Sequence, residues 1–187
     1  MHQDNWSLKA KKMGYRSRAV FKLEEILLKL HKNQINKVLD LGSAPGGWSQ
    51  FIINKYPHSK IIAVDILHME PIDGVKFIKK NIEDIDSIQL INSQKGKFDL
   101  VISDIAPNLS GISAVDNENI YELNKITINL ANIYLCEVNS AVVIKTFQNN
   151  NFKSLKKEME LFFKIVQTYK PAASKNKSAE TYLYGAR

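Results

Sequence analysis

Apolar residues recur at helical spacing near the start of the chain. Between residues 17 and 30 they occupy Ala19, Val20, Leu23, Ile26, Leu27 and Leu30. This spacing gathers them on one face, so the pattern predicts an amphipathic helix over 17–30, with the Ser17 side chain available to cap its first turn.

Further along, short runs rich in β-branched residues alternate with helical patterns. The runs lie at 37–41, 60–66, 75–79, 98–103 and 141–147. The helical patterns lie at 47–55, 84–93, 117–138 and 153–162, and the last segment, 169–184, is predicted to be a loop followed by a strand at 181–184. Strands that alternate with helices predict an α/β, Rossmann-like fold. Such a fold has a mostly parallel central sheet flanked by helices on both faces, and ligands bind at the carboxyl ends of its strands.

Length and composition fit one domain. The chain has 187 residues, 44% of them hydrophobic, and no repeat or linker divides it, so we expect a single domain over 1–187. The apolar runs fall short of the ~20 residues that a transmembrane helix needs, and the first residues lack the apolar core of a secretory signal. We therefore expect an intracellular protein. The single cysteine excludes an internal disulfide and a cysteine-based zinc site.

The positive charge is concentrated at the N-terminal end. The chain has a net charge of +7, and residues 1–37 hold nine basic and three acidic residues against 17 and 16 in the rest. Lysine and arginine contacts to phosphates supply most of the sequence-independent affinity for nucleic acids, so residues 1–32 are expected to bind a polyanion. A solvated helix face would give the same pattern, and charge alone does not separate the two interpretations.

A glycine-rich turn follows the first predicted strand, in the sequence VLDLGSAPGGW over 38–48. Glycines at such a turn let the backbone approach a nucleoside where a Cβ would obstruct it. The turn lacks the lysine with which a P-loop binds a triphosphate. A tight turn alone would also explain the glycines. About twenty residues later, however, the second strand reaches Asp65, where a carboxylate can accept both ribose hydroxyls, so the two features together favour an adenosine-containing cofactor.

Five separate segments carry more specific motifs. They are GYRSRAVFKL at 14–23, DLGSAPGGWSQ at 40–50, SDIAPNLSG at 103–111, VIKTFQ at 143–148, and KPAAS at 170–174 continuing to Glu180. In this order and over nearly the whole chain, they resemble the RrmJ/FtsJ family of S-adenosylmethionine-dependent ribosomal RNA 2′-O-methyltransferases. The resemblance implies the methyltransferase version of the Rossmann-like fold, with S-adenosylmethionine as cofactor and S-adenosylhomocysteine as product.

The resemblance also implies a catalytic tetrad, which falls on Lys22, Asp104, Lys145 and Glu180. A ribose 2′-hydroxyl is a poor nucleophile, so an enzyme must align it with the sulfonium methyl group and help remove its proton. Lys145 follows an apolar run at a strand end and is the candidate to orient, and to deprotonate, the hydroxyl. Asp104 is the candidate to steer Lys145, although it would equally suit the cap of a turn before Pro107. The roles of Lys22 and Glu180 depend mainly on the resemblance.

Residues around the cofactor are expected from the glycine-rich turn and from the ends of the second, third and fourth strands. The set is Gly42, Ser43, Ala44, Pro45, Gly46, Gly47, Trp48, Asp65, Ile66, Asn81, Ile82 and Asp104. Asn81 stands where many members of the family carry aspartate, and its amide can still bind an adenine edge. Trp48 is equally compatible with a buried tryptophan at a helix start. The expected RNA-binding residues are Lys9, Lys11, Lys12, Arg16, Arg18 and Lys22, and no metal site is expected.

The resemblance is strongest to the branch of the family that acts on a uridine of large-subunit ribosomal RNA. The expected partner is then ribosomal RNA or the large ribosomal subunit, and the expected enzyme is a monomer in the cytoplasm or the mitochondrion. A transfer RNA methyltransferase of the same family stays open, as does an RNA-binding assembly factor without activity, although all four tetrad positions are occupied. A small-molecule methyltransferase would leave the basic N-terminal segment unexplained.

Overall fold

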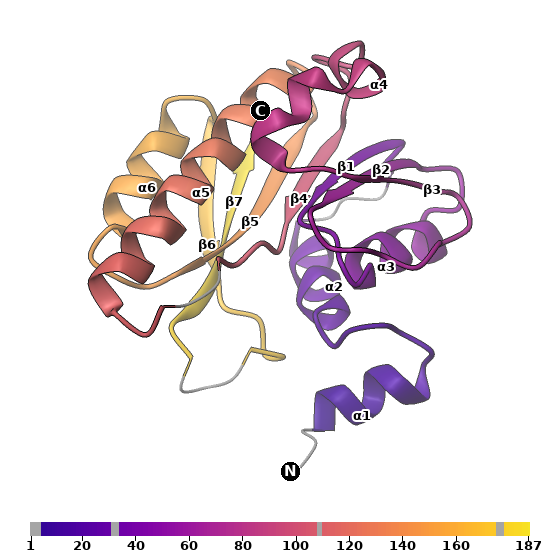
Figure 1. Cartoon of the computed structure of the whole chain (residues 1–187), viewed down its shortest axis with the longest axis horizontal. Helices are drawn as coiled ribbons and strands as arrows, with labels where there is room; N and C mark the ends of the chain where they lie inside the picture. Colours follow the sequence, from indigo (N-terminus) through magenta and orange to yellow (C-terminus); the bar gives the residue numbers. More distant parts are fainter. Residues whose placement is uncertain (1–4, 31–33, 108–109, 175–177) are drawn as a thin grey trace.

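The computed structural model describes residues 5–30, 34–107, 110–174 and 178–187, so parts of the segments discussed above, at 1–4, 31–32, 108–109 and 175–177, lie outside the described residues. One seven-stranded sheet, in the order β3-β2-β1-β4-β5-β7-β6, runs through the molecule (Figure 1). Its strands are β1 (Lys37–Leu41), β2 (Lys60–Asp65), β3 (Val75–Lys79), β4 (Leu100–Ser103), β5 (Ala141–Phe147), β6 (Ile165–Tyr169) and β7 (Glu180–Ala186). Among the described strands β7 alone runs opposite to the others, and it pairs antiparallel with β5 and β6. The described part therefore confirms the expected mostly parallel sheet.

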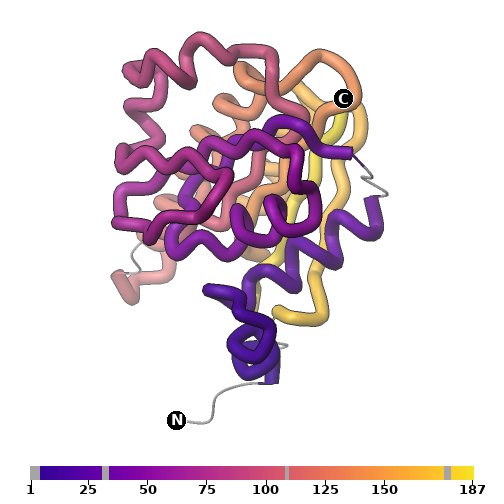
Figure 2. The backbone as a smooth tube through the Cα atoms, turned by 90° about the vertical axis from the view of Figure 1, so that its right-hand side faces the viewer, coloured from indigo at the N-terminus to yellow at the C-terminus, as the bar shows by residue number. Residues whose placement is uncertain are grey.

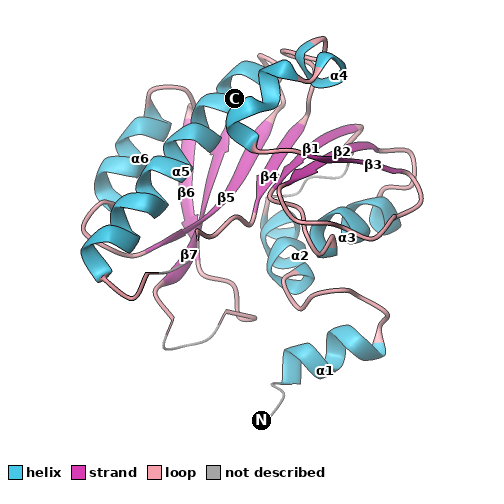
Figure 3. Ribbon diagram, in the orientation of Figure 1, coloured by secondary structure: helices cyan, strands magenta, loops and turns pink. Residues whose placement is uncertain are grey.

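Helices cover both faces of this sheet (Figure 3). They are α1 (Asn5–Lys12), α2 (Val20–Lys29), α3 (Gly47–Lys55), the short 3₁₀ helix η1 (Ile82–Ser87), α4 (Gln89–Asn92), α5 (Ser113–Tyr134) and α6 (Phe152–Glu160). Neighbouring strand residues point to opposite faces. Val38 therefore packs in a core with α2 and α3, whereas Leu39 and Leu41 pack in a second core with α5 and α6.

Helix α1 projects from the rest of the molecule (Figures 1 and 2). It is attached by aromatic packing, because the Trp6 ring lies 5.2 Å from that of Phe21 on α2. The Ala10 side chain is also buried in this contact region. The lysines of α1 thus stand on a short helix fixed to the core at one point.

Several predicted elements agree with the structure to the residue, namely β1, β3, β5 and α3. Others differ at their ends. The predicted helix over 84–93 is two pieces, η1 and α4, because Ile88 is extended. The predicted helix over 117–138 is shifted to Ser113–Tyr134, because Leu135 is extended and pairs with Phe98 in an isolated bridge. That bridge also accounts for β4 beginning two residues after the predicted start at 98.

Near the two ends of the chain, the start of one predicted helix was wrong and two further elements were not expected. The helix expected over 17–30 begins at Val20, because the Ser17 hydroxyl accepts the Ala19 N–H and the chain turns there before the helix starts. Helix α1 was not expected; it is eight residues long and buries only Ala10. Strand β6 was not expected: it lies between the helix predicted over 153–162 and the loop predicted from 169. Its edge position leaves most of its side chains exposed, without an apolar alternation.

Within the described ranges, no helix combines the length and apolar character needed to cross a membrane.

Candidate active site

A cavity of about 390 Å³ lies at the carboxyl ends of β1, β2 and β4. Seven of the residues expected around the cofactor line it: Gly42, Ala44, Asp65, Ile66, Asn81, Ile82 and Asp104. Its other walls come from Leu67, Lys80, Glu83, Ile105, Ala106, Pro107 and Leu123. The larger cavity of about 750 Å³ lies at the amino ends of β1 to β3 and includes none of the expected site residues. The smaller cavity is therefore the candidate site, where a parallel sheet binds its ligands.

Gly42 shapes this cavity in two ways. Its backbone has φ +71°, in the left-handed region that favours glycine. A Cβ at this position would lie 1.9 Å from Cγ1 of Ile105, which itself lines the cavity. The loop after β4 can approach the turn after β1 only because residue 42 has no side chain.

Asp65 ends β2 with a buried carboxylate whose two oxygens each accept one backbone N–H. Oδ2 accepts the N–H of Ala44, and Oδ1 accepts that of Leu67, both at 2.8 Å. A carboxylate has about four lone-pair sites, so capacity remains for two ribose hydroxyls. With the open space beside Gly42, this donor and acceptor set fits an adenosine-containing ligand.

Asn81 lies two residues beyond the end of β3 rather than at it. Its Oδ1 caps η1 by accepting the N–H of Glu83 at 3.2 Å, and its amide nitrogen lies 3.4 Å from the Glu83 carboxylate. The side chain is therefore fixed in the cavity wall, with amide hydrogen-bonding capacity left for a ligand edge.

The remaining expected cofactor residues lie behind the cavity rather than in its walls; these are Ser43, Pro45, Gly46, Gly47 and Trp48. The Trp48 ring is buried and donates its Nε1–H to the Ala19 carbonyl at 2.8 Å. Its side chain thus joins α3 to the start of α2. Any contact from Trp48 to a cofactor would have to come from its backbone.

The four tetrad residues form two ion pairs. Lys22 Nζ lies 2.6 Å from Glu180 Oε1, and Lys145 Nζ lies 3.2 Å from Asp104 Oδ1. Lys145 also donates to the Asp104 carbonyl at 2.5 Å. The two lysine side chains are only 7% and 11% exposed. Because Asp104 lines the cavity, the tetrad adjoins the candidate cofactor site.

Tyr182, which the sequence did not suggest, joins the two ion pairs. It lies opposite Lys145 in the β5–β7 register, and its hydroxyl donates to Asp104 Oδ1 at 3.1 Å. Lys22 Nζ lies 5.7 Å from the centre of its ring. Residues two apart on a strand share a face, so the position of Tyr182 relative to Glu180 was the one available signal.

Burial and neighbouring groups shift the pKa values of Glu180 and Tyr182. Burial would raise the pKa of the Glu180 carboxyl, but the hydrogen bond and charge of Lys22, with help from Ser174 and Lys145, lower it below its usual value. Burial, followed by the charges of Asp104 and Glu180, raises the pKa of the Tyr182 hydroxyl far above its usual value. Both shifts favour a Tyr182 hydroxyl that keeps its proton and donates a hydrogen bond, and a Glu180 side chain in its carboxylate form.

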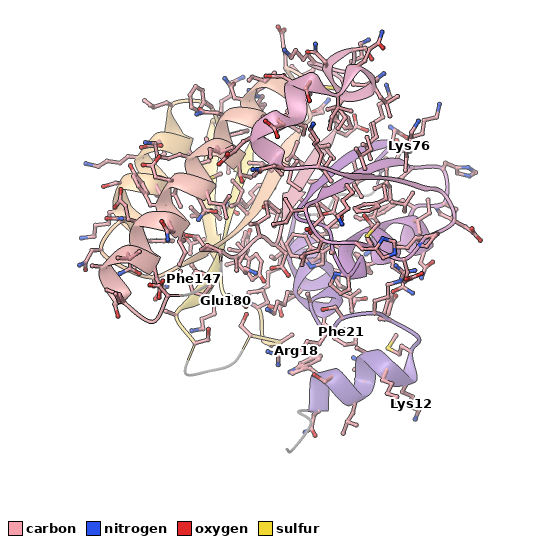
Figure 4. The ribbon with its side chains drawn as sticks, in the orientation of Figure 1. Lys12, Arg18, Phe21, Lys76, Phe147 and Glu180 are labelled. Carbon is pink, nitrogen blue, oxygen red and sulfur yellow. The ribbon has the colours of Figure 1, made fainter. Side chains whose placement is uncertain are left out.

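The six expected RNA-binding residues occupy different environments. Lys9, Lys11 and Lys12 are exposed on α1, and Lys9 Nζ lies 4.6 Å from the centre of the Phe21 ring. Lys22 is buried in the tetrad. Arg18 is half-buried and Arg16 binds backbone carbonyls, so the exposed cations gather on α1. Figure 4 shows Lys12, Arg18, Phe21 and Glu180 toward the same end of the molecule.

Solved structures that resemble this chain include methyltransferases. A ribosomal RNA methyltransferase from Plasmodium falciparum superposes with a TM-score of 0.78 at 29% identity, over 92% of this chain and 98% of that one. The 1,6-didemethyltoxoflavin-N1-methyltransferase of Burkholderia thailandensis, with bound S-adenosylhomocysteine, has a TM-score of 0.63 at 12% identity over 89% of this chain and 77% of that one, a likeness of fold alone. Fold and cavity together define the class of S-adenosylmethionine-dependent methyltransferases.

The family model of FtsJ-like methyltransferases matches residues 15–187, and the chain belongs to this family. Ribosomal RNA large subunit methyltransferase E of Polaromonas naphthalenivorans is 39% identical over 97% of this chain and 80% of that protein. The protein of the same name from Wigglesworthia glossinidia brevipalpis is 38% identical over 97% of this chain and 90% of its own length. The resemblance noted from five motifs is confirmed, as are the Rossmann-like fold and S-adenosylmethionine as the methyl donor.

Proposed function

We propose that this methyltransferase transfers the methyl group of S-adenosylmethionine to a ribose 2′-hydroxyl of RNA, in a uridine of large-subunit ribosomal RNA. The main support for the proposal is that Asp104 both lines the cofactor cavity and forms an ion pair with Lys145. Relatives that match nearly the whole chain are named for ribosomal RNA, which supports the choice of RNA.

The geometry of Lys145 suits a substrate hydroxyl. A neutral lysine amine has two N–H groups and one lone pair. In the proposed reactive state the two N–H groups donate to the carbonyl and the carboxylate of Asp104, which lie 2.5 and 3.2 Å from Nζ. The lone pair is then left to accept the O–H of the ribose beside the cavity that binds the methyl donor.

We assign the proton of the hydroxyl to Lys145. Bound S-adenosylmethionine supplies an electrophilic methyl group on a positively charged sulfur. Neutral Lys145 accepts the hydroxyl proton as the oxygen is methylated, and the Asp104 carboxylate stabilises the ammonium that forms. Tyr182 holds Asp104 in place, while the Lys22–Glu180 pair fixes the other end of the network.

For the cofactor, we propose that Asp65 accepts the ribose hydroxyls and that Asn81 binds the adenine edge. The turn from Gly42 to Trp48 contributes backbone groups and open space. Lys9, Lys11 and Lys12 on α1 would bind the RNA backbone. We further propose that residues 1–187 form one domain that acts as a monomer inside the cell, in the cytoplasm or an organelle.

Substitution of Lys145 by arginine tests its role as the base. Arginine keeps a positive charge and hydrogen-bond donors but does not accept a proton at physiological pH. We expect Lys145→Arg to bind S-adenosylmethionine in calorimetry but to lose about 10²- to 10⁴-fold in turnover, the usual contribution of general base catalysis. Near-normal turnover would show that Lys145 only orients the hydroxyl.

The substrate is tested with purified protein and radiolabelled S-adenosylmethionine. Ribosomal particles, protein-free ribosomal RNA and transfer RNA are offered separately, and the labelled nucleotide is identified by mass spectrometry. We expect a 2′-O-methyluridine in large-subunit RNA. Label confined to transfer RNA would replace the proposed substrate, and absence of label with every RNA would favour an assembly factor without activity.

A further inference from the structure

Arg16 was expected to bind RNA, yet its guanidinium is occupied by the protein itself. Nη1 donates to the carbonyls of Glu70 at 2.6 Å and of Pro45 at 3.2 Å, and Nη2 donates to that of Pro71 at 2.6 Å. One side chain thus joins two backbone segments, at 45 and at 70–71, that are far apart in the sequence. A planar guanidinium with several fixed N–H groups is suited to such bridging, whereas an ammonium acts as a single point of charge.

The segments that Arg16 joins are the two loops that form the candidate cofactor site. Pro45 lies in the glycine-rich turn after β1. Glu70 and Pro71 lie in the loop that follows Asp65, the last residue of β2. On the cavity side, the same two loops are joined by the hydrogen bond from Ala44 to the Asp65 carboxylate. The two loops are therefore joined twice, by the Asp65 carboxylate at the cavity and by the Arg16 guanidinium at Pro45, Glu70 and Pro71.

The contact is tightly packed around Gly46, where a Cβ would lie 2.7 Å from the Ile72 side chain, 2.9 Å from Met69 and 3.2 Å from Arg16 Nη1. Gly46 has φ +102°, so neither its conformation nor its surroundings favour a side chain. The absence of a side chain at residue 46 is what allows the guanidinium to reach the turn.

The backbone of Arg16 is held as firmly as its side chain. Gln50 on α3 accepts the Arg16 N–H through Oε1 at 3.0 Å and donates its Nε2–H to the Gly14 carbonyl at 2.9 Å. Segment 14–16 is thus attached to the helix that directly follows the glycine-rich turn. Both ends of the bridge are fixed, so movement of this segment would be transmitted to the turn.

We infer that Arg16 is a positioning residue for cofactor binding rather than an RNA ligand: its guanidinium holds the two cofactor loops in the arrangement that S-adenosylmethionine requires. This inference rests on the proposed assignment of the 390 Å³ cavity to the cofactor. It links the N-terminal segment that carries α1 to the cofactor site through one side chain.

The test compares the full-length protein with Arg16→Lys, Arg16→Gln and Gln50→Ala. Arg16→Lys keeps the charge that RNA would recognise but loses the forked geometry, and Gln50→Ala removes the anchor without changing any charge. Calorimetry with S-adenosylmethionine alone should show about a tenfold weaker affinity for both Arg16 variants, as expected for loss of charge-assisted hydrogen bonds. Gln50→Ala should change in the same direction. At saturating cofactor the Arg16→Lys turnover should approach that of the wild type, so KM for the cofactor rises while kcat is retained.

Lys12→Gln is the matched control, because it removes an exposed cation from α1 in the same N-terminal segment. It should weaken RNA binding and leave cofactor affinity unchanged. Arg16→Lys with wild-type cofactor affinity would overturn the inference while leaving the proposed function intact. A wild-type protein that binds no S-adenosylmethionine would overturn the cofactor assignment itself. If the Arg16 variants unfold, Gln50→Ala decides alone, and unchanged cofactor affinity in that folded variant would contradict the inference.

Discussion

Three aspartates gather at the carboxyl ends of β1, β2 and β4, and their surroundings differ in ways that separate their roles. The Asp65 carboxylate accepts hydrogen bonds from two backbone N–H groups. The Asp104 carboxylate forms an ion pair with Lys145 and accepts a hydrogen bond from the Tyr182 hydroxyl. Asp40 is buried and receives the Ser49 hydroxyl at 2.6 Å. Burial raises the pKa of the Asp40 carboxyl to about 7, and the charges of Asp104 and Asp65 act in the same direction, against the lowering effect of Ser49.

Asp40 should make folding stability depend on pH. Its pKa in the folded protein, about 7, lies above the ordinary value of 3.8, so the folded state retains a proton that the unfolded chain releases. Stability from this group is complete below the ordinary pKa and is lost as pH rises toward 7, by up to about 1.4 kcal/mol per pH unit. Asp40→Asn keeps the shape without the titration. We expect the Tm of the variant, relative to the wild type, to rise between pH 5 and pH 7 by roughly 3–6 °C per pH unit, and to change little between pH 7 and pH 8.

The measurement is thermal unfolding of both proteins across this pH range, without cofactor. Ser49→Ala is a useful companion, because loss of its hydroxyl should raise the Asp40 pKa further and extend the decline in stability to higher pH than in the wild type. Parallel Tm curves for the wild type and Asp40→Asn would show that Asp40 does not titrate in this window.

At the scale of elements, the glycine-rich turn determines how closely β1 and β4 bring their loops together. Gly42→Ala should destabilise the protein through both its left-handed backbone and the 1.9 Å approach to Ile105. Gly96→Ala is the matched control, because Gly96 has φ +68° and no described atom within 4 Å of the added Cβ. The control isolates the backbone cost, about 1–2 kcal/mol. We expect Gly42→Ala to cost about 1–3 kcal/mol more in urea unfolding, the usual cost of overpacking.

The two variants should also differ in function. Relief of the clash pushes Ile105 into the cavity that it lines, so Gly42→Ala should weaken S-adenosylmethionine binding while Gly96→Ala leaves it unchanged. Calorimetry on both folded variants checks this difference. Equal cofactor affinities would show that the loop after β4 moves to accommodate the added methyl group. Gly42 would then be needed only for the backbone conformation of the turn.

The elements that could be predicted best from sequence include strands that form a continuous apolar run, because the run itself marks where the strand begins and ends. The apolar runs of β1 and β5 are buried on both faces, and their predicted ends agree with the structure. β6 is an exposed edge strand, and α1 is held by one aromatic contact, so neither leaves a periodic signal. The ends of α5 and β4 depend on the Phe98–Leu135 bridge, which joins positions far apart in the sequence.

For the candidate site, the motifs predicted which residues meet but not how they meet. The tetrad residues form two close ion pairs, as their motif positions suggested. Tyr182 could not be assigned, because its contact with Asp104 depends on the register between β5 and β7. Arg16 was placed with the RNA-binding residues because charge can be read from sequence, whereas the partner of a guanidinium depends on tertiary structure.

At the scale of the whole molecule, the exposed lysines of α1 and the candidate site lie at the same end. The tetrad adjoins the carboxyl edge of the sheet, and α1 projects from the same side, while Lys76 lies toward the opposite side (Figure 4). Lys60 and Lys76 line the larger cavity at the amino ends of the strands. The arrangement predicts that the RNA backbone crosses the α1 side and does not cross the amino edge.

This prediction can be measured through the salt dependence of RNA binding. Each phosphate contact contributes about −0.7 to −0.9 to the slope of log affinity against log salt concentration, because bound counterions are released. The double variant Lys11→Gln/Lys12→Gln should therefore reduce the magnitude of the slope by about 1.4–1.8. The matched double variant Lys60→Gln/Lys76→Gln removes the same charge from the amino edge and should leave the slope unchanged. If the second pair reduces the slope and the first does not, the RNA crosses the amino edge, and α1 is a solvated helix whose lysines serve no RNA contact.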